Sequence, residues 1–412
     1  MLRGTVHRSV LSGVVGAWLI GLGCQGPPHP LAYRMQGGED SGGAGGSEEE
    51  SVPLPVCHDG TTTGCASIVS LAAGGRHSCA AASDGVVRCW GANDSYQLGD
   101  PTGPPSRRGK RVLSGLRDPD EMVLGWRHGC AMSGSSAHCW GRNHMGQLGT
   151  SDKVFTARPA RVRDEVARIA TFGRTTCSLA IDDDVHCWGL SLTGQGWIDE
   201  DHGVSSSVPA LVDGLDDVDT IAVGHYHACA ASRDGTVWCW GEGTNGALGQ
   251  GEAVSSALPV EVVGLPPPLR LISAGDRSTC AYAGAPAALY CWGWLAGDAS
   301  TPSLVEGLPS GTVRQLELGW RHACVLLDDG RVACWGDDGF GQLGRDEGEG
   351  AAVVEALADV AALAVGWDHA CALGQDGEVR CWGANAHGQL GRETEGSSDA
   401  SPLPVRWEGF TP

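Results

Sequence analysis

The chain has 412 residues, of which 64 are Gly, 17 Cys and 15 Trp, and its formal net charge is −21. So much Gly argues against long helices and coiled coils, and a hydrophobic fraction of 42% is too high for a disordered chain. The negative charge opposes nucleic acid and anionic lipid surfaces at long range, so we expect no nucleic-acid partner.

Residues 1–23 predict a secretory signal peptide. A short positive region with Arg3 and Arg8 precedes an apolar run of 14 residues, 10–23, which is too short to span a bilayer. The run ends at Cys24, and small residues before a lone Cys resemble the lipobox of bacterial lipoproteins, although Gly21 stands where that motif has an aliphatic residue. The sequence therefore predicts lipidation of Cys24. An ordinary secretory signal with an incidental Cys24 is the alternative.

Residues 24–66 predict the lipid-anchor Cys followed by a disordered spacer, because Gly, Ser, Glu and Pro dominate and few side chains could be buried. Residue 25 is Gln rather than Asp, which resembles an outer-membrane sorting signal. We therefore expect an exported lipoprotein of the outer membrane or cell surface. Its only membrane contact is expected to be the N-terminal lipid.

The remaining chain, 67–409, consists of repeats. Cys-Trp-Gly occurs seven times, and most copies are followed by Gly-Gln-Leu-Gly or a variant of it. The copies begin at Cys89, Cys139, Cys187, Cys239, Cys291, Cys334 and Cys381. Short β-rich segments bounded by Gly and Asp fill each unit. Repeats of about 49 residues with several short strands are typical of propeller blades, so the predicted fold class is all-β, a seven-bladed β-propeller.

Each unit has a second Cys 9 to 11 residues before its Cys-Trp-Gly, and in four units an Asp-Gly lies midway between the two. Such a hairpin places both cysteines opposite one another on adjacent antiparallel strands, within disulfide range. The predicted pairs are Cys79–Cys89, Cys130–Cys139, Cys177–Cys187, Cys229–Cys239, Cys280–Cys291, Cys324–Cys334 and Cys371–Cys381. Cys57 and Cys65 remain and can pair with each other. Zinc is the rival interpretation, but the Cys spacing lacks the short hooks of zinc sites, so no metal is expected.

The order Gly-x-x-His-x-Cys-Ala, Asp-Gly-x-Val-x-Cys-Trp-Gly-x-Asn and Gly-Gln-Leu-Gly, clearest over Gly74 to Gly99 and Gly366 to Gly391, resembles the repeat of the regulator of chromosome condensation family. The resemblance implies a seven-bladed propeller, in agreement with seven units. Two units depart from the pattern. Unit three lacks the His, and unit five has Ser278 for the His and Trp294-Leu-Ala-Gly297 for Gly-Gln-Leu-Gly.

No catalytic motif is present, and we expect neither an enzyme nor a cofactor. A His recurs two residues before the first Cys of five units, at His77, His128, His227, His322 and His369. A catalytic His does not need five copies, so we interpret these residues as structural, bonded to neighbouring backbone. The Trp residues of Cys-Trp-Gly are expected in the blade cores.

The two residues before each repeated His, or its equivalent, vary, and a propeller gathers such loops on one face. Arg, Trp and Tyr are frequent there, and these are the residues most used as interface anchors. The predicted partner-binding face comprises Arg76, Trp126, Arg127, Arg174, Tyr226, Arg277, Trp320, Arg321, Trp367 and Asp368. We expect its Trp residues to cluster and to be partly exposed. Alternatively, Arg and Trp stack on one another and only pack the loops.

Gly-Trp-Arg-His at 125–128 and 319–322 resembles a motif of plant ultraviolet-B photoreceptors of this family. An exported chain is an improbable photoreceptor, and it would not meet the cytosolic GTPase on which the founding family member acts. Exported bacterial relatives bind target proteins through propeller loops. The sequence therefore favours a monomeric, non-enzymatic propeller that binds an unknown extracytoplasmic protein. Guanine-nucleotide exchange or another signalling role is the alternative, and an envelope hydrolase is a weaker one.

Overall fold

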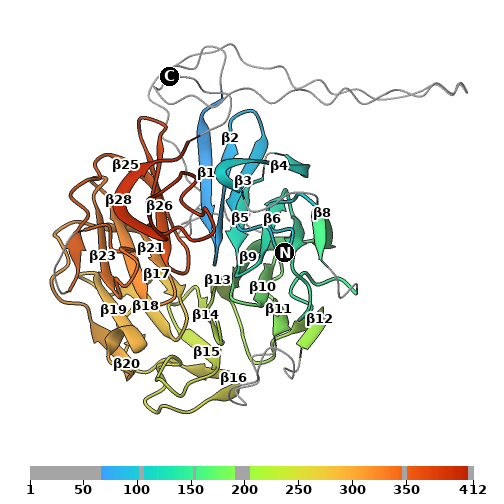
Figure 1. Ribbon diagram of the computed structural model, residues 1–412. Coiled ribbons are helices and arrows are strands. Elements are labelled where there is room, and N and C mark those ends of the chain that lie inside the picture. Colours follow the sequence, from blue (N-terminus) through green and yellow to red (C-terminus); the bar gives the residue numbers. More distant parts are fainter. Residues whose placement is uncertain are drawn as a thin grey trace, which may run out of the picture.

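Seven four-stranded sheets surround a central axis in the computed structural model, which describes residues 66–101, 106–117, 119–151, 155–190, 205–345 and 350–406 (Figure 1). Each sheet consists of four antiparallel strands that are consecutive in the chain. The predicted seven-bladed β-propeller is confirmed. The predictions for Cys24, Cys57, Cys65 and the spacer lie outside the described residues.

Blade one contains β1 to β4, and the blades follow in chain order to blade seven, β25 to β28. The first strands, nearest the axis, are β1 (Ile68–Ala73), β5 (Glu121–Leu124), β9 (Val166–Phe172), β13 (Val218–Val223), β17 (Leu269–Ala274), β21 (Val313–Leu318) and β25 (Val360–Val365). The second strands are β2 (His77–Ala82), β6 (His128–Ser133), β10 (Thr175–Ala180), β14 (His227–Ser232), β18 (Ser278–Ala283), β22 (His322–Leu327) and β26 (His369–Gly374).

The third strands are β3 (Val86–Gly91), β7 (Ser136–Gly141), β11 (Val185–Leu190), β15 (Val237–Gly241), β19 (Ala288–Gly293), β23 (Val332–Gly336) and β27 (Val379–Ala384). The fourth strands are β4 (Ser106–Arg117), β8 (Thr156–Arg163), β12 (Ser205–Leu211), β16 (Ser256–Glu261), β20 (Ala299–Leu304), β24 (Ala352–Val353) and β28 (Ser398–Pro404). A single turn of 3-10 helix, η1 (Trp294–Ala296), follows β19.

The second and third strands of each blade form the predicted hairpin. In all seven hairpins the two cysteines face one another and form a disulfide, with Cα atoms 4.0–4.1 Å apart. The turn needs one residue with positive φ, which Gly supplies in blade one (Gly85, φ 75°) and Asp183 (φ 73°) in blade three. The irregular loops of blades two and five keep the same Cys register.

In five blades the Trp of Cys-Trp-Gly joins the blade to the preceding one. Its indole Nε1 donates a hydrogen bond to the first carbonyl of the preceding Gln-Leu-Gly or Ala-Leu-Gly segment. The pairs are Trp90–Gln389 (2.9 Å), Trp140–Gln97 (3.0 Å), Trp188–Gln147 (3.0 Å), Trp292–Ala247 (2.8 Å) and Trp382–Gln342 (2.9 Å). The first pair closes the ring, where β1 lies beside β25 (Figure 1). Unit five lacks the motif, and Trp335 of the next blade accordingly finds no acceptor among the described residues.

The repeated His makes a second link between blades. His128, His227 and His369 hydrogen-bond through Nε2 to a Ser or Thr hydroxyl of the following blade. The partners are Thr176 (3.0 Å), Thr279 (2.8 Å) and Ser78 (2.9 Å), each the second residue of its strand. The prediction of a structural role is therefore confirmed. The expected backbone partner was wrong, because the partners of these rings are side-chain hydroxyl groups of the next blade.

The remaining two His residues have no hydroxyl group at the equivalent position of the following blade. The residue that would supply the hydroxyl is Gly129 for His77 and Ala370 for His322. Neither imidazole has a hydrogen-bond partner among the described residues, and both are fully buried. A side chain at position 129 is excluded, because a Cβ there would lie 2.5 Å from Cζ2 of Trp140. Position 370 already carries a Cβ.

We expect Ala370→Ser to stabilise the propeller by about 1 kcal/mol, because the new hydroxyl can bond the ring of His322, which has no partner within the described ranges. Thermal and urea unfolding measure the effect. Ala323→Ser is the matched control, since the preceding blade carries Ser278 in place of the His, and a buried hydroxyl there should destabilise. Equal effects of the two substitutions would contradict the hydroxyl–imidazole rule.

Candidate protein-binding face

The loops between the first and second strands meet at one end of the axis. We call these residues, 74–76, 125–127, 173–174, 224–226, 275–277, 319–321 and 366–368, the axial loops. Backbone hydrogen bonds join neighbouring loops, among them Trp126 N to Gly173 O (2.8 Å), Trp320 N to Trp367 O (2.9 Å) and Trp367 N to Gly74 O (3.2 Å). Residues far apart in the sequence therefore form one ordered surface.

The first residues of four variable pairs, Trp126, His225, Trp320 and Trp367, form an aromatic cluster with Phe172. Trp126 stacks on Trp367 with ring centroids 5.1 Å apart, and Trp320 meets Trp367 edge-on at 4.1 Å. The ring of Trp126 fits because the neighbouring residue is small: a Cβ at Gly75 would lie 2.5 Å from Cδ1 of Trp126. Sequence reasoning missed Phe172, which ends β9.

The expected partial exposure of the Trp residues is wrong for two of the three. Trp126 is 9% exposed and Trp367 is 7% exposed, whereas Trp320 is half-buried. The reason is the stacking of Trp126 on Trp367 at the axis. The alternative drawn from the sequence was stacking between Arg and Trp, which Arg127 and Arg174 make on Trp126. These rings therefore hold the axial loops together and present little surface of their own.

The second residue of each pair points outward. Its carbonyl accepts a hydrogen bond from the residue after Cys-Trp-Gly in all seven blades, at 2.7–3.0 Å. Five of these second residues form what we call the arginine rim, namely Arg76, Arg127, Arg174, Arg277 and Arg321. Arg321 is exposed and the other four are half-buried. Tyr226 and Asp368 occupy the two remaining blades.

Aromatic rings support four of the five guanidinium groups. The guanidinium carbon lies 4.7 Å from the Trp126 ring for Arg127 and 4.5 Å from the same ring for Arg174. Arg277 lies 5.2 Å from the ring of Tyr226, and Arg321 lies 5.1 Å from that of Trp294. These stacking contacts fix the direction of long side chains that would otherwise be mobile.

Carboxylates from the loops after Cys-Trp-Gly add ion pairs between blades. Arg127 pairs with Asp94 of the preceding blade at 2.8 Å, and Arg277 faces Glu242 at 3.5 Å. Sequence reasoning missed both carboxylates, which stand at different positions after Cys-Trp-Gly. Arg127 and Arg277 are therefore held by a carboxylate as well as by an aromatic ring.

Asp368 interrupts the rim in blade seven. Burial and the neighbouring charge of Asp337 raise the pKa of Asp368 to about 6, while Arg76 and Arg321 on either side oppose that shift. Within the aromatic cluster, His225 bonds Asp276 at 3.2 Å, yet burial lowers the pKa of His225. The face thus combines five Arg side chains with one carboxyl group whose raised pKa of about 6 still leaves it mostly ionised at neutral pH.

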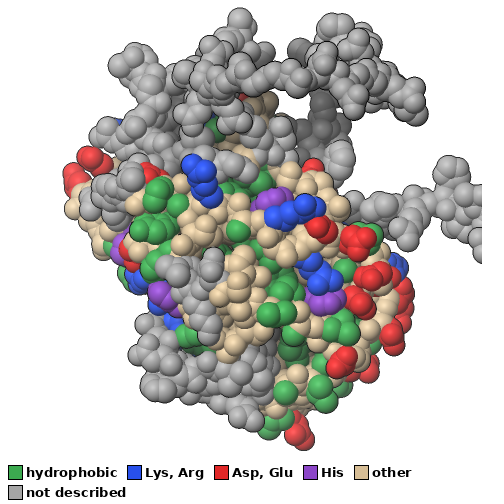
Figure 2. All heavy atoms as spheres, turned by 90° about the vertical axis from the view of Figure 1, so that its right-hand side faces the viewer, with side chains coloured by type: hydrophobic (Ala, Val, Ile, Leu, Met, Phe, Trp, Pro, Cys, Tyr) green, Lys and Arg blue, Asp and Glu red, His purple; other side chains and the backbone are tan. Residues whose placement is uncertain are grey.

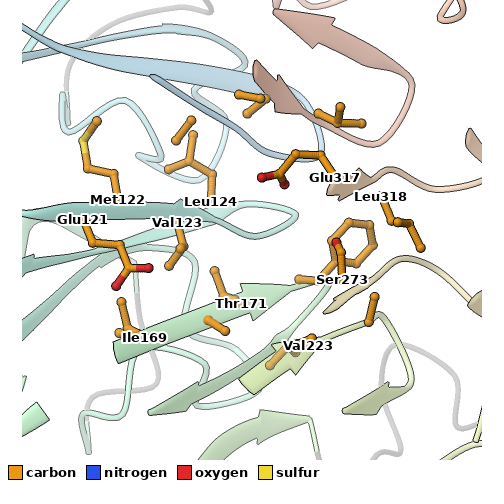
Figure 3. Close-up of a pocket in the computed structure, with 18 of the residues that line it drawn as sticks. Glu121, Met122, Val123, Leu124, Ile169, Thr171, Val223, Ser273, Glu317 and Leu318 are labelled. Atoms are coloured by element: carbon orange, nitrogen blue, oxygen red, sulfur yellow. The ribbon is translucent and has the colours of Figure 1, made fainter. Parts of the chain in front are cut away.

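Below the axial loops, the first strands enclose an axial cavity of about 170 Å³ (Figure 3). The carboxyl groups of Glu121 and Glu317 point into it from β5 and β21. Burial raises the pKa of Glu121 to about 7, with Arg168 opposing, and raises that of Glu317 to about 8. Sequence reasoning missed both residues. The signal was a Glu at a strand position that a small or apolar residue occupies in most other units.

Within the described ranges no group of three or more His, Cys, Asp or Glu side chains is placed to hold a metal ion. No helix in that part of the chain has the length and apolar character of a membrane span.

Comparisons with known proteins agree with the fold. Segments 68–97, 218–247, 313–342 and 360–389, and in a second model 234–282, match the regulator of chromosome condensation (RCC1) repeat. The ultraviolet-B receptor UVR8 of Arabidopsis thaliana is 27% identical over 303 residues, 67% of each chain. The human E3 ubiquitin-protein ligase HERC2 is 28% identical over 83% of this chain, which spans only 7% of that protein.

Among solved structures, Prp20p from Saccharomyces cerevisiae superposes with a TM-score of 0.68 at 18% identity, covering 78% of this chain and 86% of that one. This likeness concerns the fold alone.

Proposed function

The chain carries regulator of chromosome condensation repeats on a seven-bladed propeller, and from this premise we propose that it is a non-enzymatic protein that binds another protein with its axial-loop face. The observation that carries the proposal is the arginine rim, whose guanidinium groups stack on aromatic rings of the loops. Ordered Arg and aromatic side chains lose little entropy on binding and are frequent interface anchors. The propeller is proposed to act as a monomer.

The test is capture of a partner from a cell-envelope extract with the oxidised protein. Charge reversal by Arg127→Glu with Arg321→Glu should weaken binding of the captured partner by more than about 1 kcal/mol. Because Arg127 is half-buried and pairs with Asp94, its reversal should also lower the melting temperature, so the affinity is measured on the folded fraction. Isothermal titration and thermal unfolding measure the two effects.

Arg233→Glu with Arg331→Glu is the matched control. Both residues lie in or next to hairpin turns at the opposite end of the second strands; Arg233 is exposed and Arg331 is half-buried. The control should leave partner binding unchanged. If Arg127→Glu with Arg321→Glu unfolds the protein while the folded fraction binds normally, these arginines only pack the loops and the function lies on another face.

We further propose an extracytoplasmic location. Seven disulfides in the described residues suit an oxidising compartment, where such bonds persist. Guanine-nucleotide exchange, the alternative, requires a cytosolic GTPase and fits this setting less well. The finer proposal is an envelope lipoprotein anchored through Cys24.

Labelling with a radioactive fatty acid should mark the wild-type protein and not Cys24→Ala, because only the Cys thiol and its new amino terminus accept lipid. The label is read in the envelope fraction after gel separation. Unlabelled protein free in the periplasm would contradict the lipid anchor, and Cys24→Ala would then fractionate like the wild type.

A further inference from the structure

The carboxyl group of Glu317 is the one feature of the axial cavity wall that breaks the repeat without a structural reason. Glu317 is the last residue but one of β21, and its side chain points into the cavity (Figure 3). The equivalent residues of the other six first strands are uncharged, namely Ala72, Val123, Thr171, Ala222, Ser273 and Ala364. A charged group thus interrupts a neutral ring of residues around the axis.

No residue in the described part of the chain balances this carboxyl group. It has no hydrogen bond or ion pair there, and burial alone raises the pKa of Glu317 to about 8. Glu121, the other carboxyl group in the cavity wall, differs, because Arg168 and a backbone hydrogen bond with Ile169 stabilise its charged form. Burying a carboxyl group without a partner costs stability, so the fold gains nothing from Glu317. A bound cation would supply the missing partner.

The remainder of the cavity suits a short alkyl chain. Its volume is about 170 Å³, and apolar cavities of roughly 150 Å³ accommodate a molecule of the size of benzene. Apolar side chains such as Val223 and Ala364 form most of the wall. Ser273, on the neighbouring strand β17, offers a hydroxyl at the position equivalent to Glu317.

We propose that the axial cavity binds a short aliphatic amine as its ammonium ion. The ammonium group donates hydrogen bonds to the carboxylate of Glu317 and to the hydroxyl of Ser273, and the alkyl chain lies against the apolar wall. Hydrogen bonds between two charged groups are the strong ones. A metal ion is disfavoured, because the described ranges contain no group of three or more His, Cys, Asp or Glu side chains placed to hold one. The site is separate from the axial-loop face and does not depend on protein binding.

The charge of the protein favours the same class of ligand. The net charge is −21, and in the side view of Figure 2 acidic side chains gather along one margin while Lys and Arg are few and scattered. Such a field raises the local concentration of small cations and lowers that of anions. An alkylamine, like the side chain of Lys, stays protonated up to about pH 10, so amine and carboxylate are both charged between about pH 8 and 10.

The probe is butan-1-amine, titrated into the full oxidised chain at pH 8.5 and followed by isothermal titration calorimetry. Glu317→Gln should weaken binding at least about tenfold, because the charge-assisted hydrogen bond is lost. Binding to the wild type should weaken more than about tenfold between pH 8.5 and 6.5, as Glu317 takes up its proton, and Glu317→Gln should lose this dependence. Glu121→Gln is the matched control and should bind the amine like the wild type, because Arg168 already balances that carboxyl group.

Butan-1-ol has the same shape without the charge and should bind to the wild type at least about ten times more weakly. Three outcomes would overturn the inference: no binding of the amine, equal binding of amine and alcohol, or equal effects of the two Gln substitutions. Amine binding that persists in Glu317→Gln would place the amine on exposed carboxylates of the surface. The comparisons of amine with alcohol and of the two pH values use the wild type, so they do not depend on the folding of a variant.

Discussion

Acid should unfold this propeller at a mildly acidic pH, with a steep loss of unfolding free energy between pH 6.5 and 5. The five repeated His side chains are fully buried. Burial lowers their pKa from 6.5, to about 4 for His227 and to about 3 for the other four. These rings stay neutral in the folded protein, whereas in the unfolded chain they titrate near pH 6.5.

The direction follows from proton binding. As the pH falls below 6.5, the unfolded chain takes up protons that the folded chain cannot, so stability is complete above that pH and is lost toward the folded pKa. At pH 5 each His contributes a loss of about 2 kcal/mol, or roughly 10 kcal/mol for five. That is comparable with the whole stability of a typical domain, about 5–15 kcal/mol.

Two carboxyl groups act in the opposite direction. The pKa values of Glu121 and Glu317 are raised to about 7 and about 8, so the folded protein binds protons that the unfolded chain releases. Their contribution therefore rises as the pH falls through 8 and 7, and offsets part of the His loss. Stability should pass through a maximum near pH 6.5 and drop by several kcal/mol below it.

Urea unfolding at a series of pH values measures the loss of stability on both sides of the maximum. His322→Asn removes one titrating group without removing a hydrogen bond, because that ring has no partner among the described residues, and should reduce the acid slope by about one proton. Glu317→Gln should abolish most of the loss above pH 7. An unchanged acid slope in His322→Asn would show that this ring is protonated in the folded state.

Reduction of the disulfides should also cause a large loss of folding stability. The chain reduced in denaturant should fail to regain cooperative unfolding when it is returned to native buffer with a reductant, whereas the oxidised chain refolds. Each disulfide closes a loop of about 11 residues, worth up to about 3 kcal/mol in chain entropy. The hairpins are local, so seven bonds contribute less than seven times that amount.

The folded protein should resist reduction. Cys324 and Cys334 are 0% exposed in the middle of blade six, so a reductant reaches them only after local or global opening. Tryptophan fluorescence and thiol titration over time follow the two processes. Cys324→Ala with Cys334→Ala should lower stability by up to about 3 kcal/mol. If the fully reduced chain melts like the oxidised one, the disulfides contribute nothing.

The repeat pattern alone determined the fold class and the disulfide pairing. Seven copies of Cys-Trp-Gly at similar intervals specify seven similar units. An Asp-Gly midway between two cysteines places the hairpin turn there, so that the two cysteines lie opposite one another on paired strands. Both are local properties, because strand pairing within one hairpin depends on residues close in the chain. The departures in unit five were also visible, and their structural consequence is that the indole of Trp335 has no acceptor among the residues that the structure describes.

Only the tertiary structure decided how the face is divided. The sequence grouped Trp126 and Arg127 as equal members of a binding surface, yet closing the ring buries the first against Trp367 and leaves the second at the rim. This contact joins blades two and seven. The spacing of repeats in the sequence does not place two blades accurately enough to predict a contact between their side chains. The same holds for His322 and Ala370, and for Glu317 in the axial cavity. Their environments consist of residues from other blades, so burial and missing partners emerge only when the seven sheets are packed around one axis.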